Sequence, residues 1–109
     1  MNLTNEKIVV LGGAGFIGSH IVDQLRREPV REIVVLDNFV RGKRANIADA
    51  LADPRVRLIE GSITSPDLLA SALENAAGVV HLAALWLYEC VHQPRSALEV
   101  NVVGTYNVV

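Results

Sequence analysis

The sequence predicts an α/β fold in which helices cover both faces of a doubly wound parallel sheet. Short runs rich in β-branched residues alternate with segments of helical spacing along the whole chain. Half of the residues are hydrophobic, which is typical of a sheet that is buried on both faces. With 109 residues, the chain is long enough for one small domain and too short for two.

Four apolar runs are predicted as strands, because branched side chains suit a pleated and packed surface. They are Lys7–Leu11, Glu32–Leu36, Val56–Glu60 and Gly78–Leu82. Strands that alternate with helices imply right-handed crossovers and therefore a parallel sheet. The expected strand order is 3-2-1-4, which is half of a doubly wound sheet.

The first two expected helices differ in the strength of their patterns. Phe16–Arg27 places Ile17, Ile21 and Leu25 on one apolar stripe, as an amphipathic helix requires. Ala45–Leu51 has a weaker helical pattern. We expect helices in both segments, between the first three strands.

Two more helices are expected in the second half of the chain. Pro66 suits the first turn of a helix, Ser65 is placed to cap it, and Asp67 is favoured near the positive end of the helix dipole. The last helix is expected to start near Pro94 and to run to the end of the chain, without a glycine cap or a basic last turn. The fourth strand would leave an apolar sheet edge uncovered. We therefore expect residues 1–109 to be the N-terminal portion of a larger domain.

Composition argues against several classes of protein. Ten basic and 12 acidic residues give a net charge of −2, so nothing in the overall charge attracts nucleic acid. The longest largely apolar run, residues 79–87, is far shorter than the roughly 20 residues that span a bilayer, and the N-terminus has no signal pattern. The single cysteine, Cys90, forms neither an internal disulfide nor a thiolate cluster. We expect a cytoplasmic protein without a metal, a membrane contact or a nucleic-acid partner.

A glycine-rich loop follows the first predicted strand directly. Residues 12–18 fit G-x-G-x-x-G when counted from Gly13 and G-x-x-G-x-x-G when counted from Gly12. Glycines permit a tight turn and let backbone N–H groups approach a pyrophosphate, to which the following helix presents its positive end. Gly18 lets that helix pack closely on the strand. No Lys-Ser or Lys-Thr follows Gly18, so an ATP-binding P-loop is excluded.

An acidic residue, Asp37, follows the second predicted strand, 19 residues after Gly18. A carboxylate at this position accepts hydrogen bonds from the ribose hydroxyls of an adenosine. It favours NAD over NADP, because it repels a 2′-phosphate. Arg41, Lys43 and Arg44 follow closely, and either reverse that preference or are ordinary surface charges.

Four segments in order resemble a known family. They are Leu11–His20 (LGGAGFIGSH), Leu36–Phe39 (LDNF) with Gly42–Arg44 (GKR), Val80–Ala84 (VHLAA) and Asn101–Asn107 (NVVGTYN). Together they resemble the extended short-chain dehydrogenases/reductases, and among these the NAD-dependent nucleotide-sugar epimerases and dehydratases, of which UDP-glucose 4-epimerase is a familiar member. The resemblance covers essentially the whole chain, and it implies the N-terminal portion of a Rossmann-type NAD(P)-binding domain, with the substrate domain outside this chain.

The resemblance implies NAD as the cofactor and assigns its contacts residue by residue. The implied contacts are Gly12, Gly15, Phe16, Ile17 and Gly18 for the pyrophosphate, Asp37 and Asn38 for the ribose, Ser62 and Ile63 for the adenine, Leu82, Ala83 and Ala84 toward the nicotinamide, and Asn101 either as a cofactor contact or as a residue behind one.

The same resemblance implies an enzyme that interconverts or dehydrates a nucleoside-diphosphate sugar, most simply a UDP-sugar, through transient hydride transfer to NAD. It also implies a homodimer for the full-length form. The family's Tyr-x-x-x-Lys is missing, because Tyr88 is followed by His92 at the fourth position and Tyr106 lies too near the end. We therefore expect no catalytic residue in this chain and no activity from it alone. Two alternatives stay open, a non-catalytic NAD-binding or interaction module and a reductase of another small molecule.

Several residues depart from the family's usual pattern. Leu11 stands where Thr is usual, and Ser62 stands where Asp is usual. Trp86 and Leu87 occupy a loop that is often smaller or more polar, where an aromatic ring either shields the active-site mouth or only packs. His81 lies in a predicted strand, where a neutral and hydrogen-bonded imidazole is expected.

Overall fold

One four-stranded parallel sheet forms the centre of the molecule. The computed structural model describes residues 2–109. The strands are β1 (Lys7–Leu11), β2 (Glu32–Asp37), β3 (Val56–Glu60) and β4 (Gly78–His81). They lie in the order β3-β2-β1-β4, so β2 and β3 extend the sheet on one side of β1, and β4 pairs with β1 on the other side. The predicted strands and strand order are confirmed.

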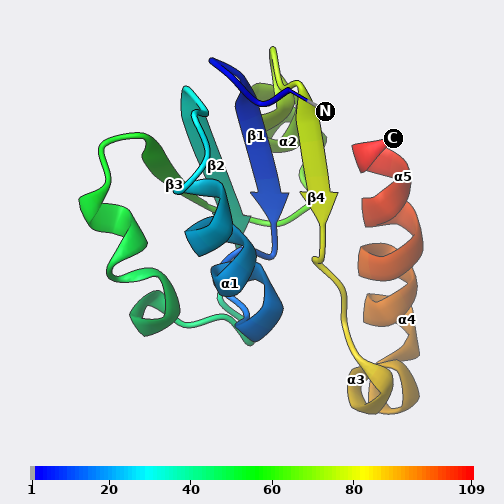
Figure 1. Cartoon of the computed structure of the whole chain (residues 1–109). Helices are drawn as coiled ribbons and strands as arrows, with labels where there is room; N and C mark the ends of the chain where they lie inside the picture. The colour runs from blue at the N-terminus through cyan, green and yellow to red at the C-terminus, as the bar shows by residue number, and fades with distance from the viewer. Residues whose placement is uncertain (1) are drawn as a thin grey trace.

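Helices cover both faces of this sheet (Figure 1). One face carries α1 (Phe16–Leu25) and two 3-10 turns, η1 (Arg44–Ile47) and η2 (Ala50–Ala52). The other face carries α2 (Pro66–Leu73) and, after the short α3 (Leu87–His92), the consecutive segments α4 (Pro94–Ala97), η3 (Leu98–Gly104) and α5 (Thr105–Val108).

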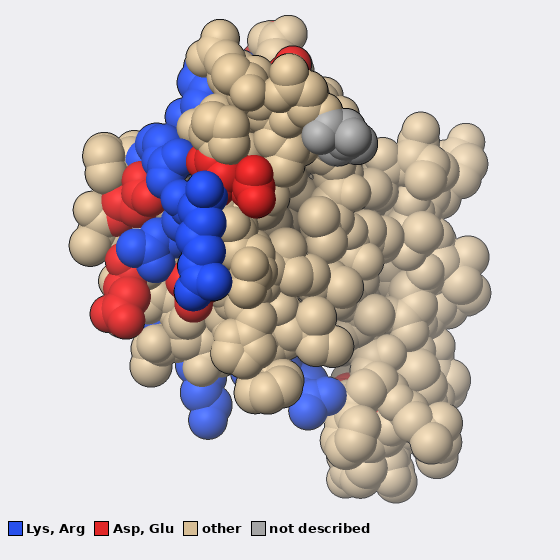
Figure 2. Space-filling view, viewed as in Figure 1, with Lys and Arg blue, Asp and Glu red and all other residues tan. Residues whose placement is uncertain are grey.

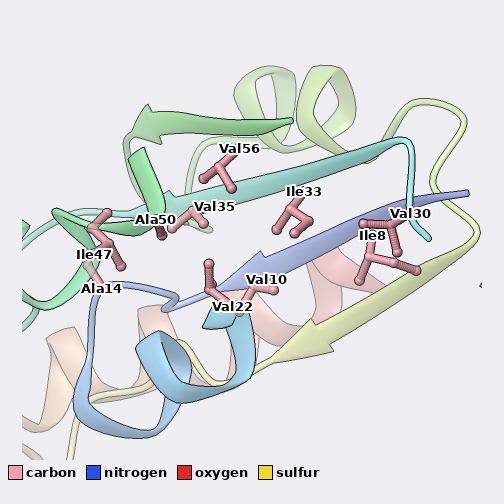
Figure 3. Close-up of a cluster of buried hydrophobic side chains, with 10 residues drawn as sticks. All are labelled: Ile8, Val10, Ala14, Val22, Val30, Ile33, Val35, Ile47, Ala50 and Val56. Carbon is pink, nitrogen blue, oxygen red and sulfur yellow. The ribbon is translucent and has the colours of Figure 1, made fainter. Parts of the chain in front are cut away.

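The central strands separate two hydrophobic cores. Side chains of a strand point alternately to opposite faces of its sheet, so neighbouring residues of β1 and β2 belong to different cores. Val10 and Val35 pack with Val22 of α1 in the core that Figure 3 shows. Val9 and Val34 pack in the other core, beneath α2 and the C-terminal segments. Every residue of β1 is buried, so the glycine-rich loop that follows it is anchored to a fully buried central strand.

The predicted apolar stripe of α1 is only partly correct. Ile21 and Leu25 pack against the core, but the side chain of Ile17 is 62% exposed. Gly18 and Val22 face the sheet instead. The start of α1 lies so close to the glycine-rich loop that only a residue without a side chain fits at Gly18. Ile17, the first isoleucine of the predicted stripe, is turned toward solvent.

Two other helices differ from their predictions. The expected helix at Ala45–Leu51 is replaced by η1 and η2, whose buried residues Ile47 and Ala50 are spaced at i, i+3, the repeat of a 3-10 helix. Ser65 precedes α2 as expected, but its hydroxyl makes no capping bond; its carbonyl accepts from the N–H of Leu69 at 3.0 Å.

The C-terminal helix begins at Pro94 as predicted, but residues Leu98–Gly104 form a π-helical stretch within it. A short helix, α3, also occupies Leu87–His92, where a loop was expected. Leu98, Val102 and Tyr106 recur every fourth residue and leave an apolar face in solvent. On the face that Figure 2 shows, the surface over these segments is almost free of charged side chains. Among residues 2–109, no helix is long and apolar enough to cross a membrane.

His81 joins β4 to the C-terminal segments. Its Nε2 lies 2.9 Å from the hydroxyl oxygen of Thr105, and its Nδ1 is buried without a hydrogen-bond partner among the described residues. Burial lowers the pKa of His81 from its usual 6.5, because the charged form loses hydration. The expected neutral and hydrogen-bonded imidazole agrees with this geometry.

Stability is therefore expected to fall as the pH drops below about 6.5. The unfolded chain then binds a proton that the folded chain resists, so stability is full above the unfolded pKa and declines below it. The measurement is urea denaturation between pH 7.5 and 5, with His81→Asn as the variant and the exposed His92→Asn as its control. A decline of the same size in His81→Asn would assign the effect to another group.

Candidate functional site

The glycine-rich loop turns sharply at the carboxyl end of β1. Gly12 has a φ of 82°, a conformation that disfavours residues with a side chain, and its N–H donates to the carbonyl of Leu36 at 2.7 Å. A Cβ on Gly12 would lie 2.9 Å from the backbone nitrogen of Ala83. The loop is therefore wedged between the ends of β2 and β4, and Gly12 is required there for space as well as for conformation.

The start of α1 is open to an anion. Gly15 is the N-cap residue, and the first turn of α1 contains no acidic side chain. The first N–H groups of a helix have no partner within the helix and carry its positive end. Apart from the residues next to it in the chain, the only described atom within 4 Å of a Cβ on Gly15 would be the carbonyl oxygen of Gly12, at 3.4 Å, so there is open space beside Gly15.

Two adjoining hollows lie along this loop. The first lies at the carboxyl ends of the strands, where β2 and β4 flank β1. Successive strands are added on opposite sides of this point, which is called the switch point of the sheet, and open α/β sheets bind their ligands there. The predicted residues that line it are Gly12, Gly15, Asp37, Asn38, Ser62, Ile63, Leu82, Ala83 and Ala84. The predicted residues that line the second are Gly12, Gly15, Phe16, Ile17, Gly18, Leu82 and Ala84. Of the predicted contacts, Asn101 alone lines neither.

Asp37 fastens the glycine-rich loop to the loop that follows β2. Its side chain is 7% exposed. One carboxylate oxygen accepts from the N–H of Ala14 at 2.9 Å and the other from the N–H of Phe39 at 2.8 Å. A Cβ on Gly42 would lie within 3.0 Å of both carboxylate oxygens, so the chain passes directly over the acid. Asp37 thus lines the first hollow from a fixed position.

The loop after β2 is fastened a second time, through Ala14. The carbonyl of Ala14 accepts from the N–H of Lys43 at 3.0 Å and from the side-chain amide of Asn46 at 2.8 Å. Both ends of the loop are thereby held against the glycine-rich loop. Its middle, Val40 and Arg41, lines the first hollow, and Arg41 also lines the second.

Ser62 and Ile63 form the far wall of the first hollow, after β3. The Ser62 hydroxyl lies 2.8 Å from the Thr64 hydroxyl and accepts from the Thr64 N–H at 3.1 Å. Ile63 is 2% exposed, and its carbonyl accepts from the Asn107 side chain at 3.1 Å. A Cβ on Gly104 would lie 2.7 Å from the Ile63 side chain. The C-terminal segments therefore position this wall.

Asn101 positions the segment after β4. The N–H of Leu85 donates to its Oδ1 at 2.7 Å, and its Nδ2 donates to the carbonyl of Leu85 at 2.9 Å. Asn101 lies in the middle of η3, the π-helical stretch, a distortion that is frequent at functional sites. The sequence left two roles open for Asn101, a direct cofactor contact or a residue behind one. The geometry favours the second role, because Asn101 lines neither hollow and holds Leu85, which lines the first.

The contacts of Gly42, Leu85 and Asn107 were not predicted. The partners of Leu85 and Asn107 lie 16 and 44 residues away, and the close approach of Gly42 to Asp37 depends on the path of the loop between them. The motif assigned Asn101 a role at or behind the cofactor, but it did not identify Leu85 as its partner. No group of three or more acidic, histidine or cysteine side chains in residues 2–109 is arranged to hold a metal ion.

The chain is similar to known proteins along almost its whole length. The chain is 35% identical to UDP-glucuronic acid decarboxylase 3 of Arabidopsis thaliana, over 96% of this chain and 30% of that protein. The Bordetella bronchiseptica enzyme WbmF, solved with NAD+ and UDP, superposes with a TM-score of 0.86 at 36% identity, over 97% of this chain and 31% of the other. DesIV, a dTDP-glucose 4,6-dehydratase of Streptomyces venezuelae solved with NAD bound, gives a TM-score of 0.87 at 39% identity, over 94% and 34%.

These relatives confirm the resemblance to enzymes of nucleotide sugars, and the chain spans about a third of their length. One family model matches residues 9–109, which include the glycine-rich loop, Asp37 and the Asn101 segment. The chain belongs to the 3-beta hydroxysteroid dehydrogenase/isomerase family.

Proposed function

We propose that the chain is the NAD-binding, N-terminal portion of an enzyme that converts a nucleoside-diphosphate sugar. The observation that carries the proposal is the first hollow, which places the glycine-rich loop and Asp37 together at the switch point of the sheet. The relatives support it, because WbmF was solved with NAD+ and UDP and the others are named for UDP- and dTDP-sugar chemistry. A UDP-sugar is the first substrate to test, with epimerisation, dehydration and decarboxylation as the candidate reactions.

The open space above Gly15 fits a pyrophosphate, because it adjoins the positive end of α1 and a side chain would fill it. Asp37 faces the same hollow with acceptor oxygens, as a ribose requires. Ile63 supplies an apolar wall for a base, and Leu82, Ala83 and Ala84 continue the groove beyond β4. When bound, NAD supplies a hydride acceptor, and the residues of this chain bind and orient it.

The first test is calorimetric titration of the purified chain with NAD. We expect saturable binding of one NAD per chain, tighter than the binding of NADP. A folded chain that binds neither dinucleotide would contradict the proposal.

The second test is turnover of UDP-sugars with NAD present, which we expect the 109 residues alone not to support. General acid–base help contributes roughly 10²–10⁴-fold to such reactions, and the Tyr-x-x-x-Lys that would supply it is absent here. Turnover would assign a base to this chain, with Tyr88 as the first candidate.

A further inference from the structure

Arg41 and Trp86 meet across the groove. The Arg41 guanidinium carbon lies 4.4 Å from the centroid of the Trp86 ring system. Arg41 belongs to the loop after β2, and Trp86 belongs to the segment after β4, so the two come from opposite sides of β1. A guanidinium above an indole face is attracted by the negative face of the ring. This contact, the Arg41–Trp86 bridge, joins the two segments that flank the carboxyl end of β1.

Both ends of the bridge are held by other contacts. The loop that carries Arg41 is fastened to Ala14 on either side, through Asp37 and Lys43. The residue before Trp86 is held by both amide atoms of Asn101. The bridge is therefore a contact between two anchored segments.

Stacked rings also orient the indole. The Trp86 ring stacks on that of Tyr88 at a centroid distance of 6.2 Å and an interplanar angle of 29°. Tyr88 in turn lies 4.3 Å from the ring of His92. Trp86, which is 52% exposed, is therefore contacted by the Tyr88 ring as well as by Arg41.

The charge of Arg41 is available to a ligand. None of the ion pairs within residues 2–109 includes Arg41. Arg41 lines both hollows, and the second hollow also contains Gly15 and the first residues of α1. A free guanidinium and the positive end of a helix thus share one hollow, and both favour an anion.

We propose that Arg41 binds the pyrophosphate of the dinucleotide and that Trp86 is the positioning residue that holds its guanidinium over the groove. The inference rests on the proposed function and adds to it a cation outside the glycine-rich loop. It also gives a role to Trp86, a large aromatic residue that is exposed on the segment after β4. The guanidinium offers paired N–H donors to phosphate oxygens, and a lysine would act only as a point charge.

The test compares adenosine, which has no pyrophosphate, with ADP and NAD, which both contain one. Arg41→Ala is expected to weaken ADP and NAD about tenfold, the effect of losing one charge-assisted hydrogen bond, and to leave adenosine unchanged. Arg27→Ala is the matched control, because Arg27 is an exposed arginine that lines neither hollow. Equal ADP affinities in Arg41→Ala and Arg27→Ala would overturn the inference.

The role of Trp86 has its own test. Trp86→Ala is expected to weaken ADP about threefold, as the loss of an exposed cation–π contact implies, and Trp86→Phe is expected to restore most of it. Trp86→Leu, which fills space without a ring face, is expected to behave like Trp86→Ala. Full affinity in Trp86→Leu would overturn the positioning role.

If the wild-type chain binds no NAD, the proposed function fails and this inference fails with it. If the wild-type chain binds NAD and Arg41→Ala binds NAD equally well, the inference alone fails.

Discussion

Gly18→Ala is expected to abolish cofactor binding because it displaces the start of α1. A Cβ on Gly18 would overlap the carbonyl oxygen of Gly12 and lie 2.7 Å from the Cα of Gly13. Both obstacles are backbone atoms, so no side-chain rotation relieves the overlap, and the helix must move away from the glycine-rich loop. We expect a loss of about 3 kcal/mol or more in the free energy of unfolding, the upper range for overpacking. Urea denaturation measures the stability, and calorimetry should detect no NAD binding.

Gly15→Ala is the matched variant, since it adds the same methyl group three residues earlier. Its Cβ would make only an ordinary contact, at 3.4 Å from the carbonyl oxygen of Gly12. We therefore expect stability within about 1 kcal/mol of wild type, together with NAD binding weakened at least about tenfold, because the methyl group enters the ligand's space. Gly15→Val should abolish binding in a folded protein. Wild-type NAD affinity in folded Gly15→Val would show that the loop has only a structural role.

This pair of glycines illustrates what the sequence could and could not predict at the site. The motif identifies both as loop glycines and assigns the close helix packing to the last of them. It does not say how little space each has, since the atoms that Gly18 meets are placed by the turn at Gly12. The same crowding explains why the predicted stripe of α1 was displaced, with Ile17 turned outward. Helical spacing predicts an apolar face but not which part of it reaches the sheet.

The strands were predicted almost residue by residue, because burial on both faces leaves nearly unbroken apolar runs such as that of β1. The segment between β2 and β3 was not, since its structure depends on long-range contacts such as that of Asn46 with Ala14. The Arg41–Trp86 bridge joins residues 45 positions apart in the sequence, and no local sequence pattern predicts it. The sequence therefore did not predict the contacts between loops that meet only across the folded sheet.

Replacement of Asp37 is the second change with a large expected effect. Its carboxylate has two tasks in the structure, since it fastens Ala14 and Phe39 and also lines the first hollow. Asp37→Ala removes both and leaves two N–H groups without their acceptors. We expect stability to fall by roughly 1–3 kcal/mol and NAD affinity to fall by about 10- to 100-fold, measured by denaturation and calorimetry. Glu60→Gln is the control, because Glu60 is an exposed acid paired in register with Asp37 on the neighbouring strand.

Asp37→Asn separates the two tasks. An amide keeps one acceptor oxygen, so part of the loop fastening survives, while the negative charge that repels a 2′-phosphate is lost. The ratio of NADP to NAD dissociation constants is therefore expected to approach one in Asp37→Asn, with a smaller loss of stability than in Asp37→Ala. An unchanged ratio would mean that the shape of the loop, held by Gly42 and Lys43, excludes the phosphate. Equal affinity for the two cofactors in the wild-type chain would overturn the preference itself, and would direct attention to Arg41, Lys43 and Arg44 as phosphate ligands. Because Asp37 is already bonded to two backbone N–H groups, we expect it to select the cofactor through its fixed position as much as through its charge.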